Sequence, residues 1–139
     1  MRRLIGIGNP DRGDDAAGWE VASRVSTWTV RRCVSGSLSL IDGWEPTDDV
    51  VIVDAMRSGM APGSVRTFDA MTESLPAGTF SSTHSFGPAE IVELARAMHR
   101  MPRSLRVIGI EVEQTDHGAE LSPQVAWSVV NVAKELQDA

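Results

Sequence analysis

The segment that most constrains the fold is residues 4–18, in which an apolar strand, a glycine turn and an acidic helix start follow one another. Residues 4–7 carry no polar side chain, and such runs are typical of strands in parallel sheets, because both faces of these sheets are covered. The turn Gly8-Asn9-Pro10 ends the strand, since Gly and Asn tolerate positive φ and Pro has no N–H to give to a neighbouring strand. The segment predicts the first strand and first helix of an α/β fold.

Two adjacent aspartates, Asp14 and Asp15, stand at the start of this expected helix. Either carboxylate can cap the helix by accepting hydrogen bonds from its free N–H groups, and both interact favourably with its positive end. One cap is enough, and neighbouring like charges repel, so the second carboxylate is available to bind a proton or a metal ion. The motif alone leaves both interpretations open.

Strand and helix patterns alternate through the rest of the chain. We expect no regular element over residues 70–86, and a loop this long in a small domain is usually functional or mobile. The patterns predict helices over 16–26 and 36–44, from Pro88 to before Pro102, and from Ser122-Pro123 onward, and strands over 28–34, 48–55, 64–69 and 105–112. Residues 36–44 also fit a strand, but the helical spacing of their apolar side chains favours a helix.

The predicted architecture is a three-layer α/β/α sandwich in a single domain, residues 1–139, with a twisted sheet of about five mostly parallel strands. The strand over 64–69 follows its predecessor after a short turn, so it is expected to be an antiparallel edge strand. The net charge of −6 argues against a nucleic-acid binder, which needs a basic face. No apolar run is long enough to cross a bilayer. We expect a monomeric protein.

The cysteine content and the glycine motifs exclude several kinds of active site. Cys33 is the only cysteine, so an internal disulfide is impossible and a reducing, cytoplasmic setting is expected. It lies in a β-branched run, which predicts a buried, inert thiol. Asp11 stands where a dinucleotide-binding G-x-G-x-x-G motif needs its third glycine. We also find no G-x-S-x-G nucleophile turn.

Three side chains are candidates for a metal site. Asp15 follows the first strand and Asp54 ends the strand over 48–55, and the carboxyl ends of parallel strands meet at the rim where α/β sheets bind ligands. If the loop over 70–86 folds back over that rim, His84 completes a set of two oxygen ligands and one nitrogen ligand, which suits nickel, zinc or iron. A lone loop histidine can equally be a surface or cap residue. The helix-end residue His99 and the turn residue His117 are weaker candidates.

Taken in order, these motifs resemble the hydrogenase maturation endopeptidases over nearly the whole chain. The segments that carry the resemblance are Gly6-Ile7-Gly8-Asn9, Asp14-Asp15-Ala16-Ala17-Gly18, Val51-Ile52-Val53-Asp54-Ala55, Ser82-Thr83-His84, Val107-Ile108-Gly109-Ile110-Glu111 and Leu121-Ser122-Pro123-Gln124-Val125. The resemblance implies an endopeptidase that removes the C-terminal extension of a nickel-iron hydrogenase large-subunit precursor after nickel insertion. It also implies that nickel carried by the substrate is the recognition element, bound by Asp15, Asp54 and His84. Another divalent cation is expected to replace nickel in a crystal.

Two alternatives remain at this stage. The opening Gly6-Ile7-Gly8-Asn9-Pro10 also matches peptidyl-tRNA hydrolases, but Asp14-Asp15 stands where that family continues with a histidine, and the chain lacks the basic face that tRNA requires. The second alternative is a nickel-checkpoint protein or chaperone that binds the precursor without cutting it, because the candidate site consists only of metal ligands.

Overall fold

The computed structural model describes residues 1–76, 78–80 and 86–139, which form one mixed sheet in the strand order β2-β1-β3-β5-β4. The four strands β1, β2, β3 and β5 run parallel, and β4 pairs antiparallel with β5 at the edge. The strands are β1 (Arg2–Ile7), β2 (Thr29–Cys33), β3 (Asp49–Met56), β4 (Val65–Asp69) and β5 (Ser104–Glu111). The predicted sheet, including its antiparallel edge strand, is confirmed.

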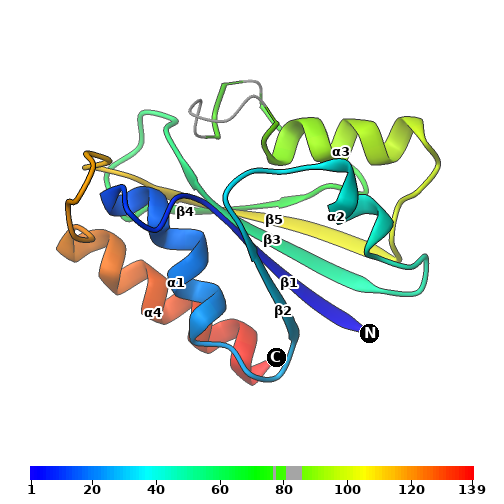
Figure 1. Cartoon of the computed structure of the whole chain (residues 1–139), viewed down its shortest axis with the longest axis horizontal. Coiled ribbons are helices and arrows are strands. Elements are labelled where there is room, and N and C mark those ends of the chain that lie inside the picture. The colour runs from blue at the N-terminus through cyan, green and yellow to red at the C-terminus, as the bar shows by residue number, and fades with distance from the viewer. Residues whose placement is uncertain (77, 81–85) are drawn as a thin grey trace.

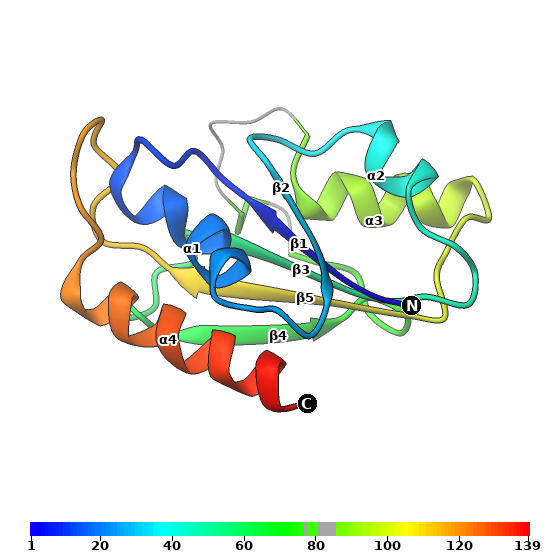
Figure 2. The ribbon, with the colours of Figure 1, turned by 60° about the horizontal axis from the view of Figure 1, so that its bottom comes forward.

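Helices cover both faces of the sheet, so the three-layer α/β/α prediction is also confirmed. Helices α1 and α4 lie on one face, and α2 and α3 lie on the other (Figures 1 and 2). The helical elements are the 3₁₀ helix η1 (Gly13–Ala16), α1 (Ala17–Ser23), α2 (Leu38–Asp42), α3 (Pro88–Ala97) and α4 (Pro123–Asp138). The ambiguous segment over 36–44 is the short helix α2, as the apolar spacing favoured.

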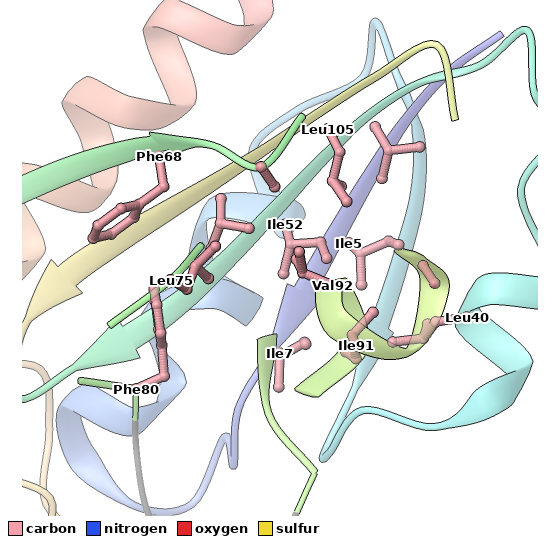
Figure 3. Packing of buried hydrophobic residues seen from close by; sticks show 14 of the residues in the cluster. Ile5, Ile7, Leu40, Ile52, Phe68, Leu75, Phe80, Ile91, Val92 and Leu105 are labelled. Carbon is pink, nitrogen blue, oxygen red and sulfur yellow. The ribbon is translucent and has the colours of Figure 1, made fainter. Parts of the chain in front are cut away.

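Neighbouring residues of the central strands face different halves of the core, which explains their uninterrupted apolar runs. In β1, Leu4 packs on the α1 and α4 side, whereas Ile5 packs on the α2 and α3 side. In β3, Val51 and Ile52 divide in the same way. Figure 3 shows the second half of the core, in which strand side chains meet those of α2, α3 and the segment before α3.

Helix α1 approaches the sheet so closely that backbone meets backbone. A Cβ atom on Gly6 would lie 2.3 Å from the carbonyl oxygen of Gly18, and one on Gly18 would lie 2.4 Å from the oxygen of Val53. Side chains at either position would push the helix away from the sheet. The two glycines therefore hold η1 and α1 against the carboxyl ends of β1 and β3.

Details of helix capping differ from the sequence prediction. Asp14 and Asp15 lie inside η1, and neither caps α1. Ser37 and Ser122 occupy the N-cap positions of α2 and α4, but neither side chain makes a capping hydrogen bond. Leu38, at the start of α2, is 47% exposed. The aspartate and serine side chains at these helix starts contact other partners or face solvent, because tertiary contacts override local preferences.

The long loop before α3 contributes to the core. Leu75 and Phe80 are buried, and Phe80 forms an isolated bridge with Met56 at the end of β3. The remaining part of the loop, residues 77 and 81–85, lies outside the described residues, and His84 with it. Within the part of the chain that the structure describes, no helix combines the length and apolar character needed to cross a bilayer.

Candidate active site

Asp54 is a buried carboxylate near the carboxyl end of the central strand β3. Its side chain is 2% exposed and accepts a hydrogen bond of 2.8 Å from the N–H of Ala55. Ile52 and Met56, two residues away on either side, pack in the core half under α2 and α3, so alternation places the Asp54 side chain on that face. A carboxyl group in the buried and otherwise apolar run of residues 50–56 is unusual, because burying its charge without a partner is costly.

Asp15 is brought to the same end of the sheet by the turn after β1. Its side chain is 1% exposed, and its Oδ2 accepts a hydrogen bond of 3.0 Å from the N–H of Asn9. A Cβ atom on Gly8 would lie 2.0 Å from the carbonyl oxygen of Asp15, so only glycine lets the turn fold back this closely. The turn glycine identified in the sequence therefore sets the position of Asp15.

The two carboxylates interact, and both are kept from water. Burial raises the pKa of the Asp54 carboxyl group well above its ordinary value, and the nearby charge of Asp15 raises this pKa further. The hydrogen bond from Ala55 acts in the opposite direction and does not cancel these effects. A buried carboxyl group whose charge is disfavoured by burial and by a neighbouring carboxylate forms a place where a proton or a cation is stabilised.

Asp14, the neighbour of Asp15, has a structural role. Its carboxylate is fully buried and accepts hydrogen bonds from the N–H groups of Glu113 and Gln114, both at 2.9 Å. It also accepts hydrogen bonds from the N–H and the Oγ–H of Ser122, at 2.7 and 2.6 Å. Asp14 thus ties η1 to the loop after β5 and to the start of α4. The sequence motif left both roles open for the two aspartates, and only Asp15 was placed in the candidate metal site.

Another buried carboxylate with a structural role, Glu111 at the end of β5, fixes the loop that follows Asp54. It is 2% exposed and accepts the N–H of Ser58 at 3.1 and 3.0 Å and the Oγ–H of Ser58 at 2.5 Å. This role of Glu111 was not predicted from the sequence. The signal was present, because an acid ending an apolar strand needs a partner when it is buried.

The described histidines do not reach the carboxylate pair as a ligand set. His99 follows α3, near the amino ends of the strands and therefore at the opposite end of the sheet, and His117 is exposed in the loop after β5. Within residues 1–76, 78–80 and 86–139, no cluster of three His, Cys, Asp or Glu side chains is arranged to hold a metal ion. His84, the predicted third ligand, lies outside these residues, so the complete trio remains a prediction.

Cys33 lies at the end of β2 and is half-buried, with its Sγ 3.9 Å from the carbonyl oxygen of Gly6. Burial raises the pKa of its thiol, and the charge of Arg31 lowers it to a lesser extent. A thiol with a raised pKa is a poor nucleophile at neutral pH. This agrees with the predicted inert role, although the side chain is less buried than expected.

Comparison with known proteins decides the family. The family model described as hydrogenase maturation protease matches residues 35–139, a range that contains Asp54 and begins after Asp15. This chain belongs to the hydrogenase maturation protease family. The resemblance read from the ordered sequence motifs is therefore confirmed.

Two solved structures of hydrogenase maturation proteases share the fold over at least 90% of their length. The [NiFe] hydrogenase maturation protease HybD from Thermococcus kodakarensis is 30% identical, with a TM-score of 0.77 and 99% of each chain covered. The [NiFe] hydrogenase maturation protease HycI from Thermococcus kodakarensis KOD1 is 25% identical, with a TM-score of 0.74, and 99% of this chain and 90% of that chain are covered.

A curated relative is longer than this chain. The hydrogenase expression/formation protein HupD of Thiocapsa roseopersicina is 30% identical over 131 residues, which make up 88% of this chain and 59% of HupD. The chain therefore spans about three fifths of the length of the curated relative that it matches.

Proposed function

We propose that this protein is an endopeptidase that removes the C-terminal extension of a nickel-iron hydrogenase large-subunit precursor. Family membership supports the reaction class. The observation that carries the proposal is the buried pair of Asp15 and Asp54 at the carboxyl ends of β1 and β3, in which the pKa of Asp54 is raised. Such a pair gains most from a cation that arrives with the substrate.

In this proposal, the substrate's nickel is the recognised element and Asp15, Asp54 and His84 supply its additional ligands. A metal ion already held by thiolates of the precursor accepts oxygen and nitrogen ligands, and this coordination orients the scissile peptide. The metal ion then polarises the peptide carbonyl or a water molecule, so the protease needs no nucleophile of its own. The raised pKa of Asp54 also makes this carboxyl group a suitable proton carrier while the site lacks a cation.

The experiment is a cleavage assay on nickel-loaded and nickel-free precursor, read by the loss of the extension on a gel or by mass spectrometry. The protein should process the nickel-loaded form and leave the nickel-free form intact. Asp15→Asn, Asp54→Asn and His84→Ala should each reduce processing by at least about 100-fold, because each removes one ligand. Binding without cleavage would identify a checkpoint protein, and equal cleavage of both precursors would refute nickel recognition.

Two other histidines provide matched controls for His84→Ala. His99→Ala and His117→Ala remove exposed imidazoles from the far end of the sheet and from the loop after β5. Both variants should process nickel-loaded precursor at the wild-type rate. A loss with His117→Ala equal to that with His84→Ala would move the nitrogen ligand to the loop after β5.

A further inference from the structure

Two arginines stand beside the carboxylate pair. Arg12 precedes Asp15 by three residues and Arg57 follows Asp54 by three, so each Cα lies within about 11 Å of the corresponding aspartate Cα. Arg57 is exposed and Arg12 is half-buried. Among the described residues, the ion pairs that form involve other cations, and neither of these arginines has a carboxylate within 4.0 Å.

One residue in the loop after β5 holds both guanidinium groups. Arg57 donates from Nη2 to the Oγ1 of Thr115 at 2.9 Å, and Arg12 donates from Nε to the carbonyl oxygen of Thr115 at 3.3 Å. Two cationic side chains therefore contact the same residue, one at its hydroxyl group and one at its carbonyl oxygen. Their mutual repulsion is relieved when an anion approaches.

The surrounding loops fix this arrangement in advance. The N–H of Arg57 donates to the carbonyl oxygen of Thr79 at 2.6 Å, and the next residue, Ser58, is held by the buried carboxylate of Glu111. Thr115 is held in place through its neighbour Gln114, whose N–H donates to Asp14. Arg57 and Thr115 therefore both lie on anchored loops, so little conformational entropy is lost when Arg57 binds a ligand.

The free donors suit a carboxylate. A guanidinium group has five N–H donors in a planar fork that matches carboxylate geometry. Each arginine uses one of these side-chain donors within the described part of the chain. Two guanidinium groups that contact one residue therefore offer several remaining N–H donors to a single ligand.

We propose that Arg12 and Arg57 form a subsite that binds a carboxylate of the polypeptide substrate next to the aspartate pair. The identity of that polypeptide rests on the proposed function; the anion subsite itself does not. The carboxylate is either the free C-terminus of the precursor's extension or an acidic side chain within that extension. Both sources present the same group to the two guanidinium forks, and the subsite orients the extension relative to the bond that is cut.

The test measures the dissociation constant of the nickel-loaded precursor for wild-type protein, Arg57→Gln and Thr115→Val. Arg57→Gln should weaken binding about fivefold, the size expected for a charge-assisted contact at a partly exposed site. Thr115→Val removes the hydroxyl that positions Arg57 and should have the same direction of effect. Arg106→Gln is the matched control, because it removes an exposed positive charge from the middle of β5. It should bind like the wild type.

Modified precursors identify the source of the carboxylate. One carries a C-terminal amide and another carries amides in place of the acidic side chains of its extension. The modification that removes the subsite's ligand should weaken binding to the wild type about fivefold and have no effect on Arg57→Gln. The subsite is disproved if neither modification weakens wild-type binding, or if Arg57→Gln and Arg106→Gln behave alike. Carboxylate-dependent binding without cleavage would refute the proposed function and leave the subsite standing.

Discussion

At the scale of single residues, the neighbours Asp14 and Asp15 have the same side chain and different roles. Asp14 has partners on both oxygens, from two distant segments of the chain. Asp15 instead faces Asp54 across the rim and raises the pKa of its carboxyl group. The difference arises from the direction in which η1 presents each side chain.

Asp14→Asn is expected to destabilise the fold by about 2–4 kcal/mol, because an amide places N–H donors against the N–H groups that the carboxylate accepts. An amide nitrogen in place of Oδ2 loses the contacts to both Glu113 and Gln114, and one in place of Oδ1 loses the contact to the N–H of Ser122. Urea unfolding followed by circular dichroism measures the change. Asp116→Asn in the same loop is the control, since that side chain is exposed, and its effect should stay within about 0.5 kcal/mol. Equal stabilities for the two variants would contradict the role assigned to Asp14.

At the scale of elements, the contact of α1 with the sheet depends on the absence of side chains. Gly18→Ala would place a methyl group 2.4 Å from the oxygen of Val53 and 2.5 Å from that of Ile7. Both obstacles are backbone atoms, so the helix has to move, and we expect a loss of about 3 kcal/mol or more. Thermal unfolding of the purified variant tests this expectation.

Gly87→Ala is a suitable control for the glycine substitution. An added methyl group there meets nothing closer than the Oε1 of Glu90 at 3.5 Å, and the residue lies just before α3. Its cost should stay below about 1 kcal/mol, the usual range for a helix N-cap change. A large loss in both variants would show that general glycine flexibility, and not the α1 contact, determines stability.

The elements were largely predictable from the sequence, but their polar contacts were not. The apolar run of residues 50–53 and the helical spacing of apolar side chains over 88–95 can both be recognised within a short stretch of sequence. The partners of Asp14 lie 99 to 108 residues away, and only the folded chain brings them together. The rim position of Asp15 and Asp54 was predictable, because parallel strands share one carboxyl edge.

The amino ends of β3 and β5 are joined by a carboxylate whose titration affects stability. Asp49 accepts hydrogen bonds from the Nε of Arg103 at 3.1 Å and the Oγ of Ser104 at 2.6 Å. Arg103 is the main cause, and Ser104 the second, of the shift of the Asp49 pKa from 3.8 to about 2. A lowered pKa stabilises the folded state above the ordinary value, and this contribution disappears as the pH falls through the folded value.

Asp49→Asn should therefore have a lower Tm than the wild type at pH 7. The gap should close as the pH falls from about 4 to about 2, where the wild type loses the contribution of this carboxylate. Thermal scans at several pH values measure both effects. Glu93→Gln on the exposed side of α3 is the control. A gap that stays constant over this pH range would show that the ion pair is not linked to folding.

At the scale of the whole molecule, the two ends of the sheet carry opposite electrostatic arrangements. At the amino ends, Asp48 and Asp49 are paired with Arg3 and Arg103. Hydrogen bonds from Arg3, and then from Glu45, hold the pKa of Asp48 well below its usual range. At the carboxyl ends, burial and then the nearby charge of Asp15 raise the pKa of Asp54. The first arrangement favours the folded state, and the second opposes it.

This asymmetry predicts that Asp54→Asn separates stability from function. The folded protein binds the Asp54 proton more tightly than the unfolded chain does, so the wild type loses stability as the pH rises above the ordinary pKa of 3.8. The amide does not titrate and keeps an oxygen for the N–H of Ala55. At pH 7 the variant should be about 1 kcal/mol more stable than the wild type, and this advantage should vanish near pH 4.

Asp49→Asn should have the opposite sign of stability change at pH 7 and retain processing of nickel-loaded precursor. An Asp54→Asn protein that is less stable than the wild type at pH 7 would mean that this buried charge stabilises the fold and is not held there for the substrate.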